Sequence, residues 1–302
     1  MKKYSRYLKK KSCTIFLFHG VIKKNESLLR NYNKKHLDKS YFIRILSDLK
    51  KNGKAISMND VLNNVKKKND FYDRSFVITF DDGFYNNYSI ALPILKKMNI
   101  PATFYITTDF IEKNLTSWVD RIEIAVNEKK KGKIKILNKN YSFINTLKSK
   151  VKFMNNLKKL IKENKKISPY MLANNIVKEL NYRKNITTSN SILDKKMNWN
   201  HIRKINNEKL FIIGGHSKTH RILSFLSKQE VKNEINQSIN ILEKKLKNKI
   251  NHYSYPEGLS HTFSNREIIL LKKRGVQCSP SAEHGINNKN SNLFKLKRIF
   301  CV

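Results

Sequence analysis

The chain has few cysteines, few acidic residues and no long apolar run. Its three cysteines, Cys13, Cys278 and Cys301, are odd in number and far apart in the 302 residues. This pattern argues against a disulfide framework and favours reduced thiols. None of the three stands at a spacing typical of metal ligands. The cysteines therefore predict a cytoplasmic protein without disulfides.

No stretch approaches the ~20 apolar residues that a membrane span needs, so we expect at most a peripheral membrane contact. The N-terminus is basic, but its only apolar run, residues 13–18, is too short for the core of a signal peptide. No cleavage site separates this run from His19 and Gly20. It predicts a first strand, and its shortness also favours a cytoplasmic location.

Acidic residues are scarce: 23 Asp and Glu stand against 62 Lys and Arg, which gives a formal net charge of +39. Such a charge suggests nucleic acid or a membrane as partner. The lysines, however, are scattered through almost every segment, and no basic stripe with interleaved aromatic residues is present. We therefore do not expect nucleic-acid binding, although the charge favours anionic substrates.

Two acidic residues follow a strand-like run, and two histidines stand far downstream. Gly83 supplies a turn that would expose Asp81 and Asp82 at the C-terminal end of the strand. One of two neighbouring carboxylates can ligate a divalent cation while the other stays free as a base. His216 and His220 are four residues apart, so both can reach the same ion. The pattern predicts one metal site, at the edge where α/β barrels carry their active sites.

The two motifs resemble those of the polysaccharide deacetylases with a NodB homology domain, carbohydrate esterase family 4. Asp81-Asp82 is similar to the first motif of that family, and the segment 216–220 is similar to the second. Residues 253–258, with the sequence Tyr-Ser-Tyr-Pro-Glu-Gly, resemble a third motif that lines one wall of the substrate groove.

The context of these motifs agrees with the resemblance. Residues 100–106 are similar to the strand that follows the first motif in the family. Phe18-His19-Gly20 resembles a Tyr-His element that opens many bacterial members. The resemblance spans about Ile15 to Ile299, with a divergent middle.

The family resemblance implies an α/β fold, a distorted or incomplete (β/α) barrel of the NodB type, and a single catalytic domain over residues 1–302. Strand and helix patterns alternate until residue 127. The alternation is absent from there to about residue 197, where it begins again. Between Lys129 and Lys166 there are 14 lysines and one acidic residue. We expect 127–197 to be a basic insertion, a solvated excursion rather than a flap over the groove. It contains a hairpin pattern over 133–143 and a helix pattern over 147–161.

The resemblance implies that Asp82, His216 and His220 hold a divalent metal. One carboxylate and two imidazoles suit Zn²⁺, with Co²⁺ or another divalent ion as alternatives. Asp81 would then be the catalytic base. The backbone N–H of Tyr255, which precedes Pro256, is the implied donor to the oxyanion.

Two histidines are candidates for the acid that protonates the leaving amine. His19 ends a strand at the expected face of the barrel, whereas His284 lies in a polar segment near the chain end, so we prefer His19. Trp118 and Asp120 could line the groove, because an indole face suits a sugar ring, but the sequence favours core packing at least as strongly. Glu257 is a groove candidate through its motif position.

One departure from the family pattern concerns the base. The third motif of many relatives begins with an arginine that tethers the catalytic aspartate, and this chain has Ser254 there. Arg298 or Arg221 could replace it in space. Without a tether, Asp81 would be held poorly.

The function implied by the resemblance is metal-dependent hydrolysis of an N-acetyl group on an amino sugar or glycan. The absence of an export signal favours an intracellular glycan or sugar intermediate, and the basic surroundings of the groove would hold a phosphate. One alternative is a deformylase or another amidase with the same metal site. Another is a non-catalytic carbohydrate-binding relative, suggested by Ser254 and by the unassigned acid.

Overall fold

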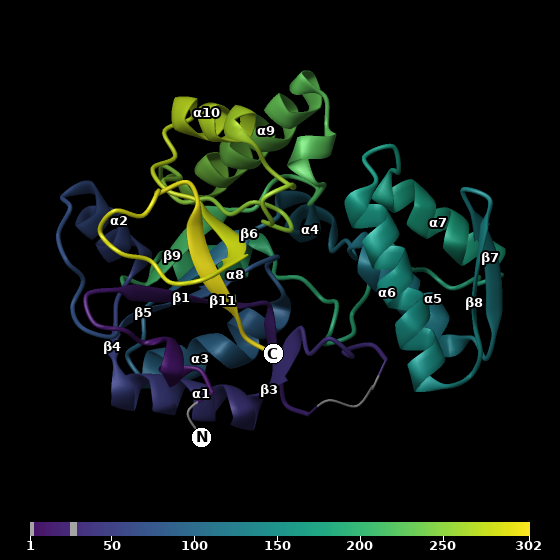
Figure 1. Ribbon diagram of the computed structural model, residues 1–302, viewed down its shortest axis with the longest axis horizontal. Helices are drawn as coiled ribbons and strands as arrows, with labels where there is room; N and C mark the ends of the chain where they lie inside the picture. The colour runs from purple at the N-terminus through teal and green to yellow at the C-terminus, as the bar shows by residue number, and fades with distance from the viewer. Residues whose placement is uncertain (1–2, 25–28) are drawn as a thin grey trace.

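A parallel sheet of seven strands forms the centre of the computed structural model, which describes residues 3–24 and 29–302 (Figure 1). Its order is β10-β11-β1-β5-β6-β9, with β4 paired to β5. The strands of this sheet are β1 (Cys13–Phe18), β4 (Lys54–Ala55), β5 (Ser75–Phe80), β6 (Ala102–Ile106), β9 (Phe211–Gly215), β10 (Pro280–His284) and β11 (Leu296–Phe300). Two short two-stranded pairs lie outside it, β2 (Gly20–Ile22) with β3 (His36–Asp38), and β7 (Gly132–Ile136) with β8 (Lys139–Phe143).

The sheet continues past β9 through single bridges rather than through a paired strand. Gly215 bridges Tyr253, and His252 bridges Cys278, shortly before β10 begins. The predicted α/β class and incomplete barrel are thus confirmed. Residues 252–255 and 276–278 contribute isolated bridges here and form no full strand.

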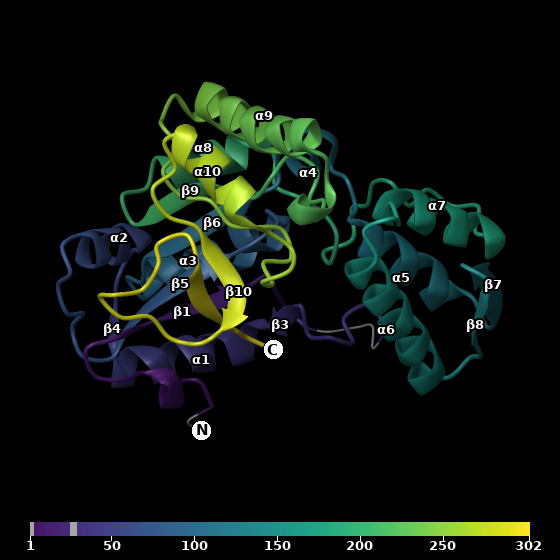
Figure 2. The same cartoon turned by 45° about the horizontal axis from the view of Figure 1, so that its top comes forward.

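Helices cover both sides of the sheet (Figures 1 and 2). In both views α1 lies on one side and α9 and α10 on the other. Every residue of β1 and β5 is buried, as expected for parallel strands covered on both faces. The helices are α1 (Lys39–Asn52), α2 (Met58–Lys66), α3 (Leu92–Lys97), α4 (Thr108–Lys113), α5 (Trp118–Glu128), α6 (Leu147–Glu163), α7 (Pro169–Glu179), α8 (Trp199–Asn206), α9 (Lys228–Leu246) and α10 (Asn265–Lys273).

Local sequence explains these helices. In α9 the apolar residues at helical spacing are buried, and Ser227 and Glu230 form the capping box that starts the helix. The segment before α3 is irregular: residues 87–91 form a π-helical turn. Pro93 has no N–H to donate to the preceding turn, which favours this irregular start.

Helices α5, α6 and α7 and the β7–β8 hairpin pack together beside the sheet (Figure 1, teal). They share a hydrophobic cluster separate from the core of the barrel, with Ile122, Phe153, Leu157 and Ile176 buried in it. This cluster contains Leu29 from the N-terminal part of the chain and then continues from Trp118 in α5, nine residues before the predicted insertion at 127. The helical unit therefore includes the helix that enters it, and whether 127–197 is an insertion stays a prediction.

The three cysteines are free and buried. Among the helices of the described ranges, none is long and apolar enough to cross a bilayer.

Candidate active site

The acidic pair sits in a tight turn at the end of β5. The Asp81 N–H donates to the carbonyl of Phe18 at 3.0 Å, and the Gly83 N–H donates to the carbonyl of Asp81 at 3.0 Å. Asp82 and Gly83 have φ angles of 75° and 84°. The left-handed region costs a non-glycine residue about 1–3 kcal/mol, and such residues concentrate at functional sites. The turn places both carboxylates at the C-terminal edge of the sheet.

The histidine loop follows β9, whose last residues are Gly214 and Gly215. These glycines are required by packing, because a Cβ on Gly214 would lie 2.6 Å from the Tyr105 ring. A Cβ on Gly215 would lie 2.6 Å from the Tyr253 ring. The close approach of these rings fixes the end of the strand that carries His216.

Helix α9 holds the rest of this loop through Glu234. The buried Glu234 carboxylate accepts from the N–H groups of Lys218 and Thr219 at 3.0 and 2.9 Å and from the Thr219 hydroxyl at 2.5 Å. The next N–H, that of His220, donates to the Ser217 hydroxyl at 2.9 Å. The loop therefore presents His220 in one orientation.

Asp82, His216 and His220 converge in space. Asp82 Oδ1 lies 3.2 Å from His220 Nε2 and 3.6 Å from His216 Nε2, and one ligand atom from each residue lies within 4.8 Å of the other two. The carbonyl of Ser254 accepts the Nδ1 proton of His216 at 2.8 Å, which leaves Nε2 free to face the site. Asp82 Oδ1 is buried without a hydrogen-bond donor in the described chain. This donor set fits one divalent metal ion.

The electrostatics suit a metal as well. Burial lowers the pKa of His216, so its imidazole is neutral and can ligate. Burial alone would raise the pKa of Asp82, but the neighbouring histidines, His220 foremost, outweigh it and hold this pKa well below its usual value. Asp82 is therefore an ionised carboxylate.

Arg298 in β11 holds the second carboxylate. Its guanidinium donates to both oxygens of Asp81 at 2.9 Å, to the Ser254 hydroxyl at 3.0 Å and to the Ser281 carbonyl at 2.6 Å. Burial would raise the pKa of Asp81, but the Arg298 charge, followed by that of His216, lowers it below its usual value. Asp81 Oδ2 lies 3.9 Å from His216 Nε2, next to the position a metal would take. Arg298 thus performs the tethering that Ser254 cannot.

Arg221, the other candidate tether, is engaged elsewhere. It contacts Glu230 at 3.0 Å and Glu234 at 3.6 Å.

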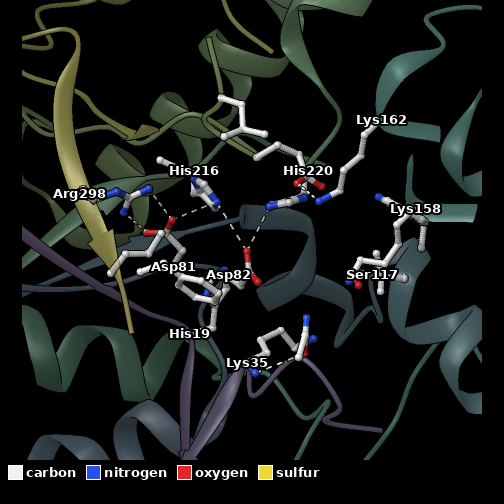
Figure 3. Close-up of a pocket in the computed structure, with 18 residues that line it drawn as sticks. His19, Lys35, Asp81, Asp82, Ser117, Lys158, Lys162, His216, His220 and Arg298 are labelled. Atoms are coloured by element: carbon white, nitrogen blue, oxygen red, sulfur yellow. Dashed lines mark hydrogen bonds and ion pairs between the residues drawn. The ribbon is translucent and has the colours of Figure 1, made fainter. Parts of the chain in front are cut away.

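These residues open into a cavity of ≈ 300 Å³ (Figure 3). One wall comes from the ends of β1, β5, β9 and β11, and the opposite wall comes from α5, α6 and the segment before β3. The lining residues from the helical side include Ser117, Trp118, Val119, Lys158 and Lys162. The helical unit therefore forms part of the site, in contrast to the solvated excursion expected from sequence.

Of the candidates His19, Trp118 and His284, the first two reach the cavity. His19 lines it beside Asp81 and Asp82, and its buried Nδ1 has no hydrogen-bond partner among the described residues. Trp118 lines it too, while its ring also belongs to the helical cluster. His284 is exposed at the end of β10, packs edge-on against Tyr7 and is not among the cavity residues. The structure therefore does not bring His284 to the site, and this residue ends a strand.

The third motif contributes mainly through backbone and Glu257. The Tyr255 hydroxyl donates to the Phe294 carbonyl, so this side chain belongs to the core. Neither Tyr255 nor Pro256 lines the cavity, but Glu257 does, and it meets Lys162 of α6 at 2.5 Å. The Tyr255 N–H makes no hydrogen bond in the part of the chain that the structure describes.

Sequence reasoning missed several residues that build the site. Glu234 looked like an ordinary helix residue, and the lysines 35, 158 and 162 were part of a general excess of lysine. Asp120, considered a groove residue, instead caps α5 and pairs with Lys35 at 2.7 Å. Only knowledge of which helix face and which loop line the cavity could have singled these lysines out.

A sequence model of the family described as polysaccharide deacetylase matches residues 68–278, which include the acidic pair, the histidine loop and the third motif. The chain therefore belongs to the polysaccharide deacetylase family, as the sequence motifs indicated. A search of curated proteins found no match.

Solved structures share the fold at low sequence identity. The Streptococcus pyogenes deacetylase PplD, in complex with acetate, is 13% identical with a TM-score of 0.61, over 96% of this chain and 92% of that one. IcaB from Ammonifex degensii is 12% identical with a TM-score of 0.62, over 98% and 94%. The BpsB deacetylase domain from Bordetella bronchiseptica is 14% identical with a TM-score of 0.57, over 97% of both chains.

Proposed function

We propose that this protein hydrolyses the N-acetyl group of an amino sugar within a glycan or sugar intermediate, and that it needs a divalent metal, most readily Zn²⁺. The observation that carries the proposal is the convergence of Asp82, His216 and His220 beside a tethered Asp81 in a cavity. A bound metal would supply Lewis acidity toward water and the amide carbonyl.

The chain's own residues divide the remaining work. Asp81, oriented by two hydrogen bonds from Arg298, takes a proton from the attacking water. The Tyr255 N–H makes no other hydrogen bond among the described residues and is the proposed donor to the oxyanion, although Tyr255 lies behind the residues that line the cavity. His19, on the opposite side of the acidic pair from the histidine loop, gives a proton to the leaving amine (Figure 3). Trp118 offers an apolar face to a sugar ring.

The test is acetate release from a panel of N-acetylated sugars, nucleotide sugars and chitin or peptidoglycan oligomers. Metal-stripped protein, protein reloaded with zinc or cobalt, and the Asp81→Asn variant are compared. We expect release only from reloaded protein with Asp81 intact. The conservative Asn keeps the shape of the side chain but cannot accept a proton.

Two outcomes would contradict the proposal. Release of formate or of another acyl group, with no acetate, would make the protein a deformylase or another amidase. Tight glycan binding with no release from any member of the panel would make it a carbohydrate-binding relative.

A further inference from the structure

Three lysines converge on the cavity wall that faces the metal ligands. Lys35 comes from the segment before β3, and Lys158 and Lys162 come from successive turns of α6 (Figure 3). Lys35 pairs with Asp120 at 2.7 Å, and Lys162 pairs with Glu257 at 2.5 Å. Two of the three positive charges are thus balanced within the protein.

Lys158 is different. Its ammonium group donates to the Tyr32 hydroxyl at 3.2 Å, and within the described ranges no carboxylate forms an ion pair with it. The side chain is half-buried and reaches toward the cavity (Figure 3). Burial, reinforced by the charge of Lys162, lowers the pKa of Lys158. A partly desolvated cation without a counter-ion is stabilised by an anion that enters the cavity.

The start of α5 lies on the same wall. Ser117 and Trp118 line the cavity, and the 11-residue helix begins there. The positive end of the helix dipole therefore faces the same space as Lys158, although the cap itself is satisfied by Ser117 and Asp120. The dipole adds to the positive potential that the lysines create.

We propose that Lys158, flanked by Lys35 and Lys162, forms a subsite for an anionic substituent of the substrate, a phosphate or a carboxylate. This inference rests on the proposed function, because it assigns the acetamido group to the metal end of the cavity and the anion to the helical end. Lysine suits such a group as a compact point charge, whereas Arg298, which also lines the cavity, is committed to Asp81.

The subsite can be tested by equilibrium binding to metal-free protein, which separates it from catalysis. The probes are UDP-N-acetylglucosamine for phosphate, N-acetylmuramic acid for carboxylate and diacetylchitobiose as a neutral reference. The variants are Lys158→Met, Lys158→Arg and, as a matched control, Lys159→Met, since Lys159 is an exposed neighbour on the same helix.

We expect an anionic probe to bind more tightly than the neutral one. Lys158→Met should weaken that binding about tenfold, which corresponds to ~1.4 kcal/mol. Lys158→Arg and Lys159→Met should keep the preference, and none of the variants should change binding of the neutral probe. The probe with the larger gain in affinity over the neutral probe identifies the anion: UDP-N-acetylglucosamine indicates phosphate and N-acetylmuramic acid indicates carboxylate.

Three results would overturn the subsite. The charged and neutral probes could bind equally, or neither anionic probe could bind detectably. Lys158→Met and Lys159→Met could also lose the same amount of affinity for the anionic probes. These results do not depend on acetate release. If acetate is released from neutral chitin oligomers while the preference for anions is absent, the subsite fails and the deacetylase function stands. If the anionic probes bind more tightly but no acetate is released from any sugar, the deacetylase function is wrong and the cavity remains an anion-binding site.

Discussion

Arg298 holds the proposed base from a strand that lies more than two hundred residues from it in sequence. Its two hydrogen bonds to Asp81 fix the direction of both carboxylate oxygens, and its contact with Ser254 fills the place where many family members carry an arginine. Arg298 therefore supplies the tether that the family resemblance led us to expect at position 254. A buried aspartate beside a metal position would otherwise be free to rotate.

Replacing Arg298 should therefore impair both catalysis and stability. Arg298→Lys keeps the charge but loses the bidentate geometry, so we expect kcat to fall by about 10²-fold. Arg298→Met leaves the Asp81 charge buried and unpaired, which should cost about 3–5 kcal/mol of unfolding free energy. The measurements are steady-state kinetics and urea unfolding.

Lys297→Met is the matched control, because this neighbour on β11 is exposed. It should leave kcat and the unfolding midpoint close to wild type. Unchanged kcat in Arg298→Lys would show that Asp81 does not need two hydrogen bonds or is not the base.

At this scale the sequence predicted the acidic pair and both histidines, because their spacing is local. It could not choose between Arg298 and Arg221, since a tether depends on which strand lies beside β5. The position of His19 at the end of a predicted strand, a local feature, favoured it over His284. Of these two histidines, the structure places only His19 at the cavity.

Helix α9 acts on the site from outside it. Its first turn contains Glu230, which caps the helix, and the next turn contains Glu234, which binds the histidine loop by three hydrogen bonds. Glu230 also pairs with Arg221, the residue after His220, so both glutamates contact the histidine loop.

Glu234→Gln should lower metal affinity about 10–100-fold, the range found when outer partners of metal ligands are removed. The neutral amide accepts hydrogen bonds less strongly than the carboxylate, so the loop that presents His220 loosens. The measurement is a competitive zinc titration with a chromogenic chelator.

Glu243→Gln serves as the control, because Glu243 lies further along α9 and pairs with Lys249 and Arg274 rather than with the histidine loop. It should bind zinc with wild-type affinity. Equal zinc affinity in both variants would contradict the positioning role of Glu234.

The elements themselves could largely be predicted, because amphipathic spacing and capping boxes are local signals. The hairpin at 132–143 and the long helices α6 and α9 follow those signals. The segments 252–255 and 276–278 contain apolar residues typical of strands but form only single bridges, because a sequence pattern does not specify the register with a neighbouring strand.

Two separately packed units meet at the cavity in the whole molecule. The barrel supplies the metal ligands, and the helical unit supplies lysines and the start of α5. Glu123 of α5 is buried near the junction, 4.0 Å from Arg30. Burial raises the pKa of Glu123 to about 7, reinforced by Asp120 and opposed by Lys35. The molecule therefore contains a buried acid that titrates near neutrality.

This acid predicts a pH dependence of stability. Between its usual pKa of 4.5 and its folded value of about 7, the native state keeps a proton that the unfolded state has lost, so stability falls as pH rises through this window. Glu123→Gln cannot ionise, and its stability relative to wild type should increase between pH 5 and pH 8. Urea unfolding at both pH values measures the difference.

Glu128→Gln is the control from the same helix, since Glu128 is partly exposed and its pKa is lowered by hydrogen bonds from Lys184 and Tyr182. It should show no such gain at pH 8. If the unfolding free energies of Glu123→Gln and wild type differ by the same amount at pH 5 and pH 8, the raised pKa of Glu123 is contradicted.

Composition alone suggested a basic protein with a solvated insertion, and at the scale of the whole molecule this was the least accurate expectation. The net charge of +39 does not tell which lysines face a cavity. Lys158 and Lys162 differ from Lys159 only in the face of α6 that they occupy, and the direction of that face is set by packing against the helical cluster.

Metal-dependent deacetylation with Asp81 as the base is tested most directly by a zinc titration of metal-free protein. The titration follows bound metal and acetate release together, with the substrate that the panel identifies. We expect acetate release to rise until one zinc ion is bound per chain. The Asp81→Asn variant should bind one zinc ion without releasing acetate, and His220→Ala should lose tight zinc binding. Acetate release from metal-free protein, or unchanged zinc binding in His220→Ala, would contradict this mechanism.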